Sequence, residues 1–219
     1  MRLSAAALAA CLLQAAAGSV AAGDGTGHRA GDFDFYVLAL SWHPSHCALT
    51  ENGRRTPGCG DGAPRAFTVH GLWPQHETGY PAFCESARPS RVPNSLARSV
   101  SDLIPDAGAA GWQWRKHGRC TGLDQDSYFE TMRAAFERVR IPESLADAVR
   151  ARTFSARDVE HAFLAVNPGM SERGIALSCR DGHLADVRIC MTRELEFRRC
   201  PEVDRNGCQA RRLRLPAAR

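Results

Sequence analysis

The sequence contains one lysine, Lys116, although 28 of its 219 residues are lysine or arginine. Every other lysine or arginine position is arginine, so we ask whether the chemistry at position 116 needs a lysine in particular. Two further absences exclude classes of protein. No long apolar run follows the N-terminal residues, so no transmembrane segment is expected. No C-x-x-C pair occurs either, which argues against a zinc ribbon.

Residues 1–22 have the pattern of a secretory signal peptide. Arg2 gives a short basic start, residues 3–17 form an apolar stretch, and Val20-Ala21-Ala22 is a small-residue cleavage site. The stretch is too short and too rich in alanine for a membrane span. A lipoprotein signal with attachment at Cys11 is an alternative, although the apolar run continues past that cysteine. We therefore predict a periplasmic or secreted protein.

The rest of the chain is predicted to be a Gly-rich disordered segment over residues 23–31 and one domain over residues 32–219. Eight cysteines remain beyond the signal. In an exported chain this even number indicates a disulfide framework, for which about 105 pairings are open. Removal of Arg2 leaves 27 basic and 24 acidic side chains, a net charge of +3. That charge mildly favours an anionic partner and equally suits a soluble basic protein.

Hydrophobic periodicity predicts an α+β fold with a mostly antiparallel sheet. The expected strands are residues 32–42, 65–73, 174–180, 183–191 and 194–200, and residues 43–65 read as a disulfide-stapled surface loop. The expected helices are residues 95–104, 126–140, 142–150 and 155–166. Their starts are assigned to a Ser95 cap, to Pro142, and to capping boxes at Ser127/Glu130 and Ser155/Asp158.

Two of the eight histidines stand in unusual settings. His70 lies inside an expected strand, directly before Gly71, and His117 follows Lys116 directly. The other six have no neighbours that complete a site, so surface or structural roles are expected for His28, His43, His46, His76, His161 and His183. Among these, the i, i+3 pair His43 and His46 is a weak metal-binding pattern that lacks an obvious third ligand.

The stretches around the two unusual histidines, "FTVHGLWP" (67–74) and "WRKHGRC" (114–120), resemble the two active-site segments of the ribonuclease T2 family, the secreted base-nonspecific acid ribonucleases. The resemblance continues through "FYVLALSWHPSHC" (35–47), "DSYFETM" (126–132) and the C-terminal cysteines, and exported bacterial members look most similar. It implies the α+β fold of that family and cleavage of single-stranded RNA with little base specificity.

The reaction that the resemblance implies uses the ribose 2′-hydroxyl as nucleophile, and needs no metal or cofactor. By position, His70 takes the role of general acid and His117 that of general base, while Lys116 stabilises the charge on the phosphorane. An ammonium suits this task because it is a compact point charge. Trp73 matches an aromatic residue of the base-binding site. The products would be a 2′,3′-cyclic phosphate and a 5′-OH end, and DNA would not be cleaved.

Three positions depart from the family's pattern. Gln113 stands where glutamate is common, Trp112 where a phosphate-contacting histidine is common, and Gln75 where many members have a base-contacting aspartate. A glutamine keeps its hydrogen bonds but lacks the charge that raises a neighbouring histidine's pKa. We therefore expect a lower pKa for His117 and a slower reaction. Trp112 and Gln75 remain candidates for substrate binding.

The resemblance also implies a disulfide pairing, Cys47–Cys59, Cys84–Cys120, Cys179–Cys208 and Cys190–Cys200. The resulting prediction is a monomeric endoribonuclease whose partner is RNA. Two alternatives stay open. One is an exported RNA-binding or effector protein of the same fold with weakened catalysis, which Gln113 and Trp112 would explain. The other is a metal-dependent nuclease built on His43 and His46.

Overall fold

The computed structural model describes residues 28–50, 59 and 65–218. The signal peptide predicted over residues 1–22 and most of the segment predicted as disordered lie outside this part of the chain. Among the residues that are described, no helix is both long and apolar enough to cross a bilayer.

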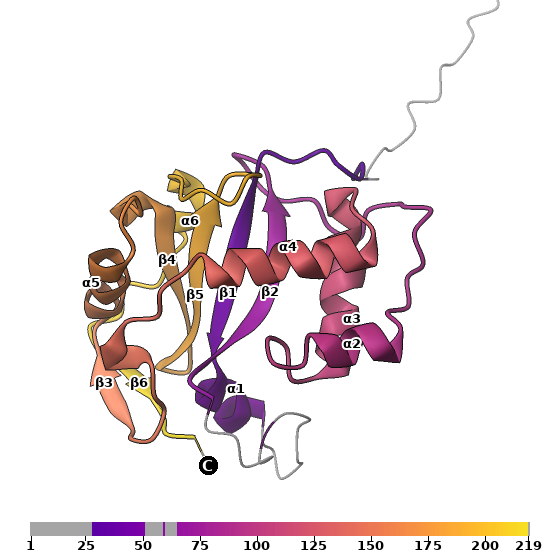
Figure 1. Cartoon of the computed structure of the whole chain (residues 1–219). Coiled ribbons are helices and arrows are strands. Elements are labelled where there is room, and N and C mark those ends of the chain that lie inside the picture. The colour runs from indigo at the N-terminus through magenta and orange to yellow at the C-terminus, as the bar shows by residue number, and fades with distance from the viewer. Residues whose placement is uncertain (1–27, 51–58, 60–64, 219) are drawn as a thin grey trace, which may run out of the picture.

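One six-stranded sheet organises the described residues (Figure 1). Its strands are β1 (Phe35–Trp42), β2 (Phe67–Gln75), β3 (Arg152–Phe154), β4 (Ile175–Arg180), β5 (His183–Met191) and β6 (Leu213–Leu215). They follow the order β2-β1-β5-β6-β3, and β4 pairs with β5. All pairings are antiparallel except the short one between β5 and β6. The predicted α+β fold with a mostly antiparallel sheet is therefore confirmed.

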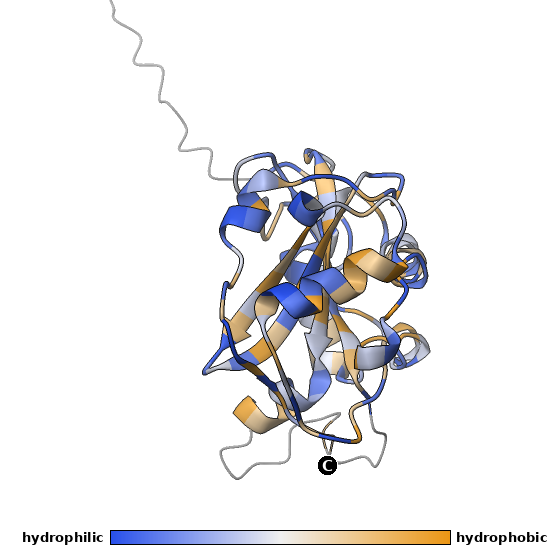
Figure 2. Cartoon of the chain, turned by 90° about the vertical axis from the view of Figure 1, so that its left-hand side faces the viewer, coloured by the Kyte–Doolittle hydropathy of each residue, from blue (hydrophilic) through white to orange (hydrophobic). Residues whose placement is uncertain are grey.

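Helices cover one face of the sheet and its ends (Figure 1). They are α1 (His43–Thr50), α2 (Asn94–Ser99), α3 (Ala107–Lys116), α4 (Gln125–Glu137), α5 (Ala156–Val166) and α6 (Pro201–Arg205). Helix α4 crosses β1 and β2, and its Phe129 and Met132 join Leu38 and Leu40 of β1 in the main core. Burial of each such side chain contributes about 1.5–3 kcal/mol. Figure 2 shows this hydrophobic interior along the central strands.

The opposite face of the central strands holds a small apolar cluster, Phe35, Val37, Cys190 and Cys200, and is polar beside it. Side chains alternate along a strand, so Ser41 of β1 and Asp186 and Arg188 of β5 point away from the side that α4 covers. The register places Ser41 opposite Asp186 and Ala39 opposite Arg188. This face is the floor on which the candidate site is built.

An irregularity between β1 and β2 determines where His70 points. Ala39 pairs with Gly71 and Leu40 pairs with Val69, so His70 is the extra residue of a β-bulge. A bulge bends the strand and redirects a side chain. Although Val69 and Gly71 are both buried, the ring of His70 is therefore exposed on the polar face.

Three helices, α1, α3 and the short α6, were not predicted from the sequence, and neither were the three-residue strands β3 and β6. Helix α1 occupies the start of the segment expected to be a loop, with Pro44 in its first turn, where proline is tolerated. Helix α3 carries two glycines, Gly108 and Gly111, and so has weak intrinsic propensity. An Asp106 cap and the complete burial of Trp114 stabilise it instead.

Two predicted elements are wrong in type. Residues 142–150 contain only a 3₁₀ turn, Glu143–Leu145, and the Asp147 carboxylate then accepts a hydrogen bond from the backbone of Val149, in competition with helix formation. Residues 194–200 form no strand, because Leu195 takes a φ of 66° and turns the chain, leaving one isolated bridge from Phe197 to Met191.

The helix caps were predicted with mixed success. The capping box of Ser155 and Asp158 is confirmed at the start of α5. Helix α4 instead begins after Asp124, whose carboxylate accepts from the backbone of Ser127, so the box predicted at Ser127 is wrong. Helix α2 follows Pro93 without any side-chain cap and ends at Ser99, so the Ser95 cap is wrong too, and the helix stops short of residue 104.

Four disulfides tie the described residues together, Cys47–Cys59, Cys84–Cys120, Cys179–Cys208 and Cys190–Cys200. These are the pairs that the family resemblance implies. The bond between Cys84 and Cys120 fixes the residues directly after His117 against the segment that precedes α2.

Candidate active site

A cleft of about 400 Å³ opens between the polar face of the sheet and helix α3. It brings together all seven residues that the sequence proposed for catalysis or substrate binding, namely His70, Trp73, Gln75, Trp112, Gln113, Lys116 and His117. The sheet supplies the first three and the end of α3 supplies the others. Gln113, Lys116 and His117 share one face of the helix because they lie three and four residues apart.

His70 is hydrogen-bonded to an acidic residue that the sequence reading did not identify. Its Nδ1 lies 3.0 Å from Oδ1 of Asp186 on β5, and 44% of the His70 side chain is exposed against 10% of the aspartate. Two hollows next to the cleft, of about 350 and 370 Å³, also share His70 in their walls. One side of this ring is therefore held by the sheet while the other meets solvent.

His117, in contrast to the half-exposed His70, is buried. It caps the C-terminus of α3 and is only 4% exposed. Burial lowers its pKa to about 3, with further contributions from the positive charge of Lys116 and from His70. The dominant cause is burial, so the lowering expected from glutamine in place of glutamate at position 113 stays a prediction. At this pKa the imidazole of His117 is neutral over the whole physiological range, and can accept a proton.

The indole of Trp73 contacts both histidines. Its ring centroid is 5.1 Å from that of His70, in an edge-to-face arrangement, and 5.3 Å from that of His117, in a stacked one. Trp73 Nε1–H donates a 2.9 Å hydrogen bond to Oε1 of Gln113. The backbone of β2 comes so close to this bond that a Cβ at Gly71 would lie 2.2 Å from the Gln113 oxygen.

Two cations border the cleft. The Nζ of Lys116 lies 5.8 Å from the ring centroid of Tyr80, and the guanidinium of Arg188 lies 5.6 Å from that of Trp73. Both cations line the cleft that holds His70 and His117. The cleft therefore suits an anion, and its aromatic walls suit planar groups.

Sequence reasoning missed three residues of this site, Tyr80, Asp186 and Arg188. The signal for the last two was available, because both are charged residues at alternate positions of an otherwise apolar strand. Tyr80 gave no comparable signal, since it lies in a loop between β2 and α2. It is 48% exposed and its ring centroid is 6.2 Å from that of His117.

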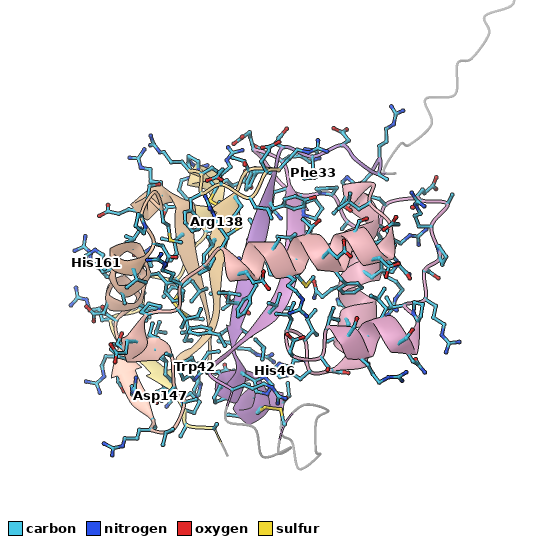
Figure 3. All side chains as sticks on the ribbon, viewed as in Figure 1. Phe33, Trp42, His46, Arg138, Asp147 and His161 are labelled. Carbon is cyan, nitrogen blue, oxygen red and sulfur yellow. A yellow bond between two sulfur atoms is a disulfide. The ribbon has the colours of Figure 1, made fainter. Side chains whose placement is uncertain are left out.

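The weak metal pattern of the sequence, His43 and His46, lies in helix α1. In the part of the chain that is described, the group close enough to hold a metal ion is His43 with Cys47 and Cys59. These two sulfurs are joined in a disulfide, so neither can supply the thiolate that binds metal. His46 lies outside that group and lines the two neighbouring hollows (Figure 3). Among the residues that the structure describes, His43 and His46 do not share one group of metal ligands.

Comparison with known proteins gives one family. The model of the Ribonuclease T2 family matches residues 33–200. A ribonuclease of Aeromonas hydrophila is 30% identical over 172 residues, covering 76% of this chain and 75% of that protein. Ribonuclease I of Escherichia coli is 29% identical over 206 residues, covering 73% and 75%.

Solved structures give the same fold. An RNase-related protein from Calystegia sepium aligns with a TM-score of 0.66 at 22% identity, over 84% of this chain and 97% of that chain. RNase NT, solved in complex with 5′-AMP, aligns with a TM-score of 0.64 at 20% identity, over 84% and 98%.

Proposed function

The chain belongs to the ribonuclease T2 family and is an endoribonuclease, and we propose that it cleaves single-stranded RNA by transphosphorylation, without metal or cofactor. The meeting of His70, His117 and Lys116 in one cleft carries this proposal. In-line attack by a ribose 2′-oxygen needs a base, an acid and a cation around one phosphate, and these three side chains supply them.

His117 is the proposed general base. Its neutral imidazole takes the 2′-OH proton while the 2′-oxygen attacks phosphorus. A base with a low pKa is weak, but the bound phosphodiester adds a negative charge nearby, which favours the protonated ring. Substrate binding therefore makes His117 a stronger base at the moment when it is needed.

His70 is the proposed general acid. Its more exposed ring contacts Trp73, as the ring of His117 does, and both histidines line the same cleft, so the two imidazoles can act on one phosphate. Protonation of the departing 5′-oxygen by His70 gives a 5′-OH end, and closure of the 2′-oxygen on phosphorus gives a 2′,3′-cyclic phosphate. DNA, which lacks the 2′-hydroxyl, is not a substrate.

Lys116 is the proposed cation for the phosphorane. The pentacoordinate state carries more negative charge than the substrate, so a nearby ammonium lowers the barrier. Arg188 is the second cation of the cleft, and its guanidinium lies beside the ring of Trp73. We assign it the role of holding the RNA backbone.

Base binding is proposed for the aromatic and amide side chains of the cleft. Tyr80 and Trp112 are each 48% exposed and offer ring surface for stacking, which accepts any base. Gln75 can hydrogen-bond to a base edge. Trp73, whose ring contacts both histidines, has a larger part in holding them than in stacking. The nucleotide complex of RNase NT, 5′-AMP in that protein, is consistent with a base site in this fold.

The test is cleavage of polyuridylate in the presence of EDTA, with analysis of the product ends. We expect cyclic phosphate and 5′-OH ends from the wild type, and a loss of about 10²–10⁴-fold in rate for His117→Ala and for His70→Ala. His161→Ala, a histidine exposed on α5 away from α3, is the matched control and keeps full activity (Figure 3). Activity abolished by EDTA would overturn the metal-free reaction, and binding of RNA without cleavage would support the alternative of a catalytically weakened RNA-binding protein.

Localisation follows from the cysteines. Four disulfides fit an extracellular or periplasmic protein, because cytosolic thiols are kept reduced. Cleavage of a signal peptide after residue 22, and a monomeric state in solution, are proposed with it. Mass spectrometry of the exported protein and light scattering test the two points.

A further inference from the structure

The polar face of the sheet holds a row of three side chains centred on Asp186. In the sheet register, Asp186 of β5 faces Ser41 of β1 on one side and Ser178 of β4 on the other. Both hydroxyls donate to its carboxylate, Ser41 Oγ at 2.7 Å and Ser178 Oγ at 2.8 Å. The aspartate is only 7% exposed. Burial of a carboxylate in the middle of a sheet costs free energy, because the charge loses its hydration, and hydrogen bonds from both sides offset this cost.

The third hydrogen bond of Asp186 goes to His70. Burial by itself raises the pKa of Asp186, but the bonds from His70, Ser41 and Ser178 outweigh it and hold that pKa at about 2. The carboxylate is therefore ionised and can only accept. It follows that Nδ1 of His70, 3.0 Å away, carries the hydrogen.

Two bulges bring this pair into contact. One makes His70 the unpaired residue of β2, and the other interrupts the pairing of β4 with β5 between Ser178 and Cys179, directly beside Asp186. Bulges redirect side chains, and here both lie next to the same hydrogen bond. With Nδ1 fixed against the sheet, the other ring nitrogen, Nε2, is the one left for the substrate.

We propose that Asp186 is the positioning residue of the general acid, and that it directs Nε2–H of His70 at the 5′-oxygen of the leaving nucleotide. This inference rests on the proposed function. As the P–O5′ bond breaks, its electron pair stays on the 5′-oxygen and the Nε2 proton moves to it, while Nδ1–H remains bonded to Asp186. Asp186 itself neither gains nor loses a proton.

The experiment compares two substrates that differ only in their need for an acid. A uridylyl dinucleotide has a basic leaving group that needs a proton, whereas uridine 3′-(4-nitrophenyl phosphate) releases a nitrophenolate that does not. For Asp186→Asn we expect kcat on the dinucleotide to fall by about 10–100-fold and kcat on the aryl ester to stay within about threefold of wild type. His70→Ala should show the same selectivity, and His117→Ala should lose both activities.

Each outcome of this experiment either supports the positioning role of Asp186 or overturns it. Equal losses of Asp186→Asn on both substrates would give Asp186 a purely structural role and overturn the inference, as would full dinucleotide activity. Aryl ester cleavage shows that the variant is folded. Ser178→Ala, which removes one hydroxyl but keeps the carboxylate, is the matched control and should lose much less than Asp186→Asn. Failure of the wild type on both substrates would instead refute the proposed function.

A second, independent observation concerns exposed aromatic side chains at the rim of the cleft. Four large apolar side chains are exposed among the described residues, and three of them, Tyr80, Phe83 and Trp112, gather around the cleft. Phe83 does not line the cleft, yet its ring meets that of Trp112 edge to face at 5.5 Å. Its backbone takes a φ of 53°, a costly conformation for a phenylalanine, and its N–H donates to the carbonyl of Lys116.

We infer that Phe83 and Trp112 form a stacking platform for a nucleobase next to those in the cleft. The platform is continuous with the catalytic cleft through Trp112, and the guanidinium of Arg115 lies 6.0 Å from the Trp112 ring centroid, where it can meet the RNA backbone. Exposed aromatic rings interleaved with a cation are the usual means of binding single-stranded nucleic acid without sequence preference.

Substrate length tests the platform. For Phe83→Ala we expect kcat/KM on a tetranucleotide to fall by about tenfold, with dinucleotide cleavage unchanged within about twofold, because stacking acts only when the extra base is present. Phe83→Tyr should restore the loss, and Val149→Ala, which removes the fourth exposed apolar side chain, should have no effect. Equal losses on both lengths would mean a structural effect on Lys116, and no loss on either would remove the platform.

Discussion

At the scale of single residues, glutamine instead of glutamate at position 113 changes the charge near His117 but not the hydrogen bond that holds Trp73. Its Oε1 accepts the indole hydrogen bond of Trp73, and a glutamate oxygen would accept the same bond. His117 lies four residues further along, on the same helix face. Glutamine thus keeps the position of Trp73 and leaves the surroundings of the proposed base without the negative charge that a glutamate would add.

Gln113→Glu should move the acid limb of the kcat/KM profile to higher pH by about one unit. The added carboxylate favours the protonated form of His117 and raises its pKa, so the neutral base is lost at a higher pH than in the wild type. A pH–rate series on a dinucleotide measures this. Gln75→Glu, the same chemical change on the β2 wall of the cleft, is the control and should shift the limb less. An unmoved limb in Gln113→Glu would contradict the coupling.

The buried His117 should also make folding sensitive to acid. Its pKa of about 3 lies below the value of about 6.5 in an unfolded chain. The unfolded state therefore gains a proton first, and stability is lost as the pH falls from 6.5 towards 3. Between pH 7 and pH 4 this amounts to about 3 kcal/mol of unfolding free energy.

Urea unfolding at the two pH values checks the effect. His117→Gln should lose about 3 kcal/mol less than wild type between pH 7 and pH 4. Equal losses for wild type and His117→Gln would show that His117 is not the group responsible.

At the scale of secondary-structure elements, β2 and α3 meet at Gly71. The φ of this glycine is not in the left-handed region, so its role is to let the two elements approach. An added Cβ would lie 2.2 Å from Oε1 of Gln113 and 2.4 Å from Nε1 of Trp73, in the middle of their hydrogen bond. Neither side chain is free to move away, since Gln113 is buried and Trp73 contacts both histidines.

Gly71→Ala should therefore reduce kcat/KM by about tenfold to hundredfold, because it displaces Trp73 and with it the two histidines. Gly111→Ala on α3 is the matched control. There the new Cβ meets only the flexible end of Arg115, at 3.1 Å, so activity should stay and helix propensity should add up to about 1 kcal/mol of stability. Dinucleotide kinetics and thermal unfolding measure both variants, and full activity in Gly71→Ala would disprove the contact's importance.

At the scale of the whole molecule, the disulfides differ in what they connect. Cys84–Cys120 joins residues 36 apart and anchors the chain just beyond Lys116 and His117, whereas Cys190–Cys200 closes a separation of 10 next to the C-terminal helix α6. The first bond therefore constrains the catalytic segment itself, whereas the second belongs to a small apolar cluster with Phe35 and Val37, against which Trp73 packs.

Two double variants test this difference, one with serine at Cys84 and Cys120 and the other with serine at Cys190 and Cys200. Loss of Cys84–Cys120 should cost about 4 kcal/mol and loss of Cys190–Cys200 about 3 kcal/mol, since the entropy of loop closure grows with loop length. Under conditions where both variants remain folded, activity should fall more in the first than in the second, because Cys84–Cys120 holds the segment of Lys116 and His117 directly and Cys190–Cys200 acts only through the packing of Trp73. Denaturant unfolding and RNA cleavage test the pair, and equal activity losses would contradict the anchoring role.

Elements with a strong local signal were predictable from the sequence. The hairpin of β4 and β5 has alternating side chains and an Asp181-Gly182 turn, and α5 has its capping box. Helix α3, the element that carries half of the site, was not predictable in this way. Its two glycines weaken the local preference, and the burial of Trp114 against distant residues decides its conformation.

The sequence by itself determined which chemistry is present, because two histidines and one lysine stand in two recognisable segments whatever their surroundings. Only the tertiary structure decided their states. Asp186 reaches His70 across 116 positions of sequence, through strand register and a bulge, and burial of His117 depends on how α3 packs against β2. Register and burial arise from contacts between distant segments, so no local pattern encodes them.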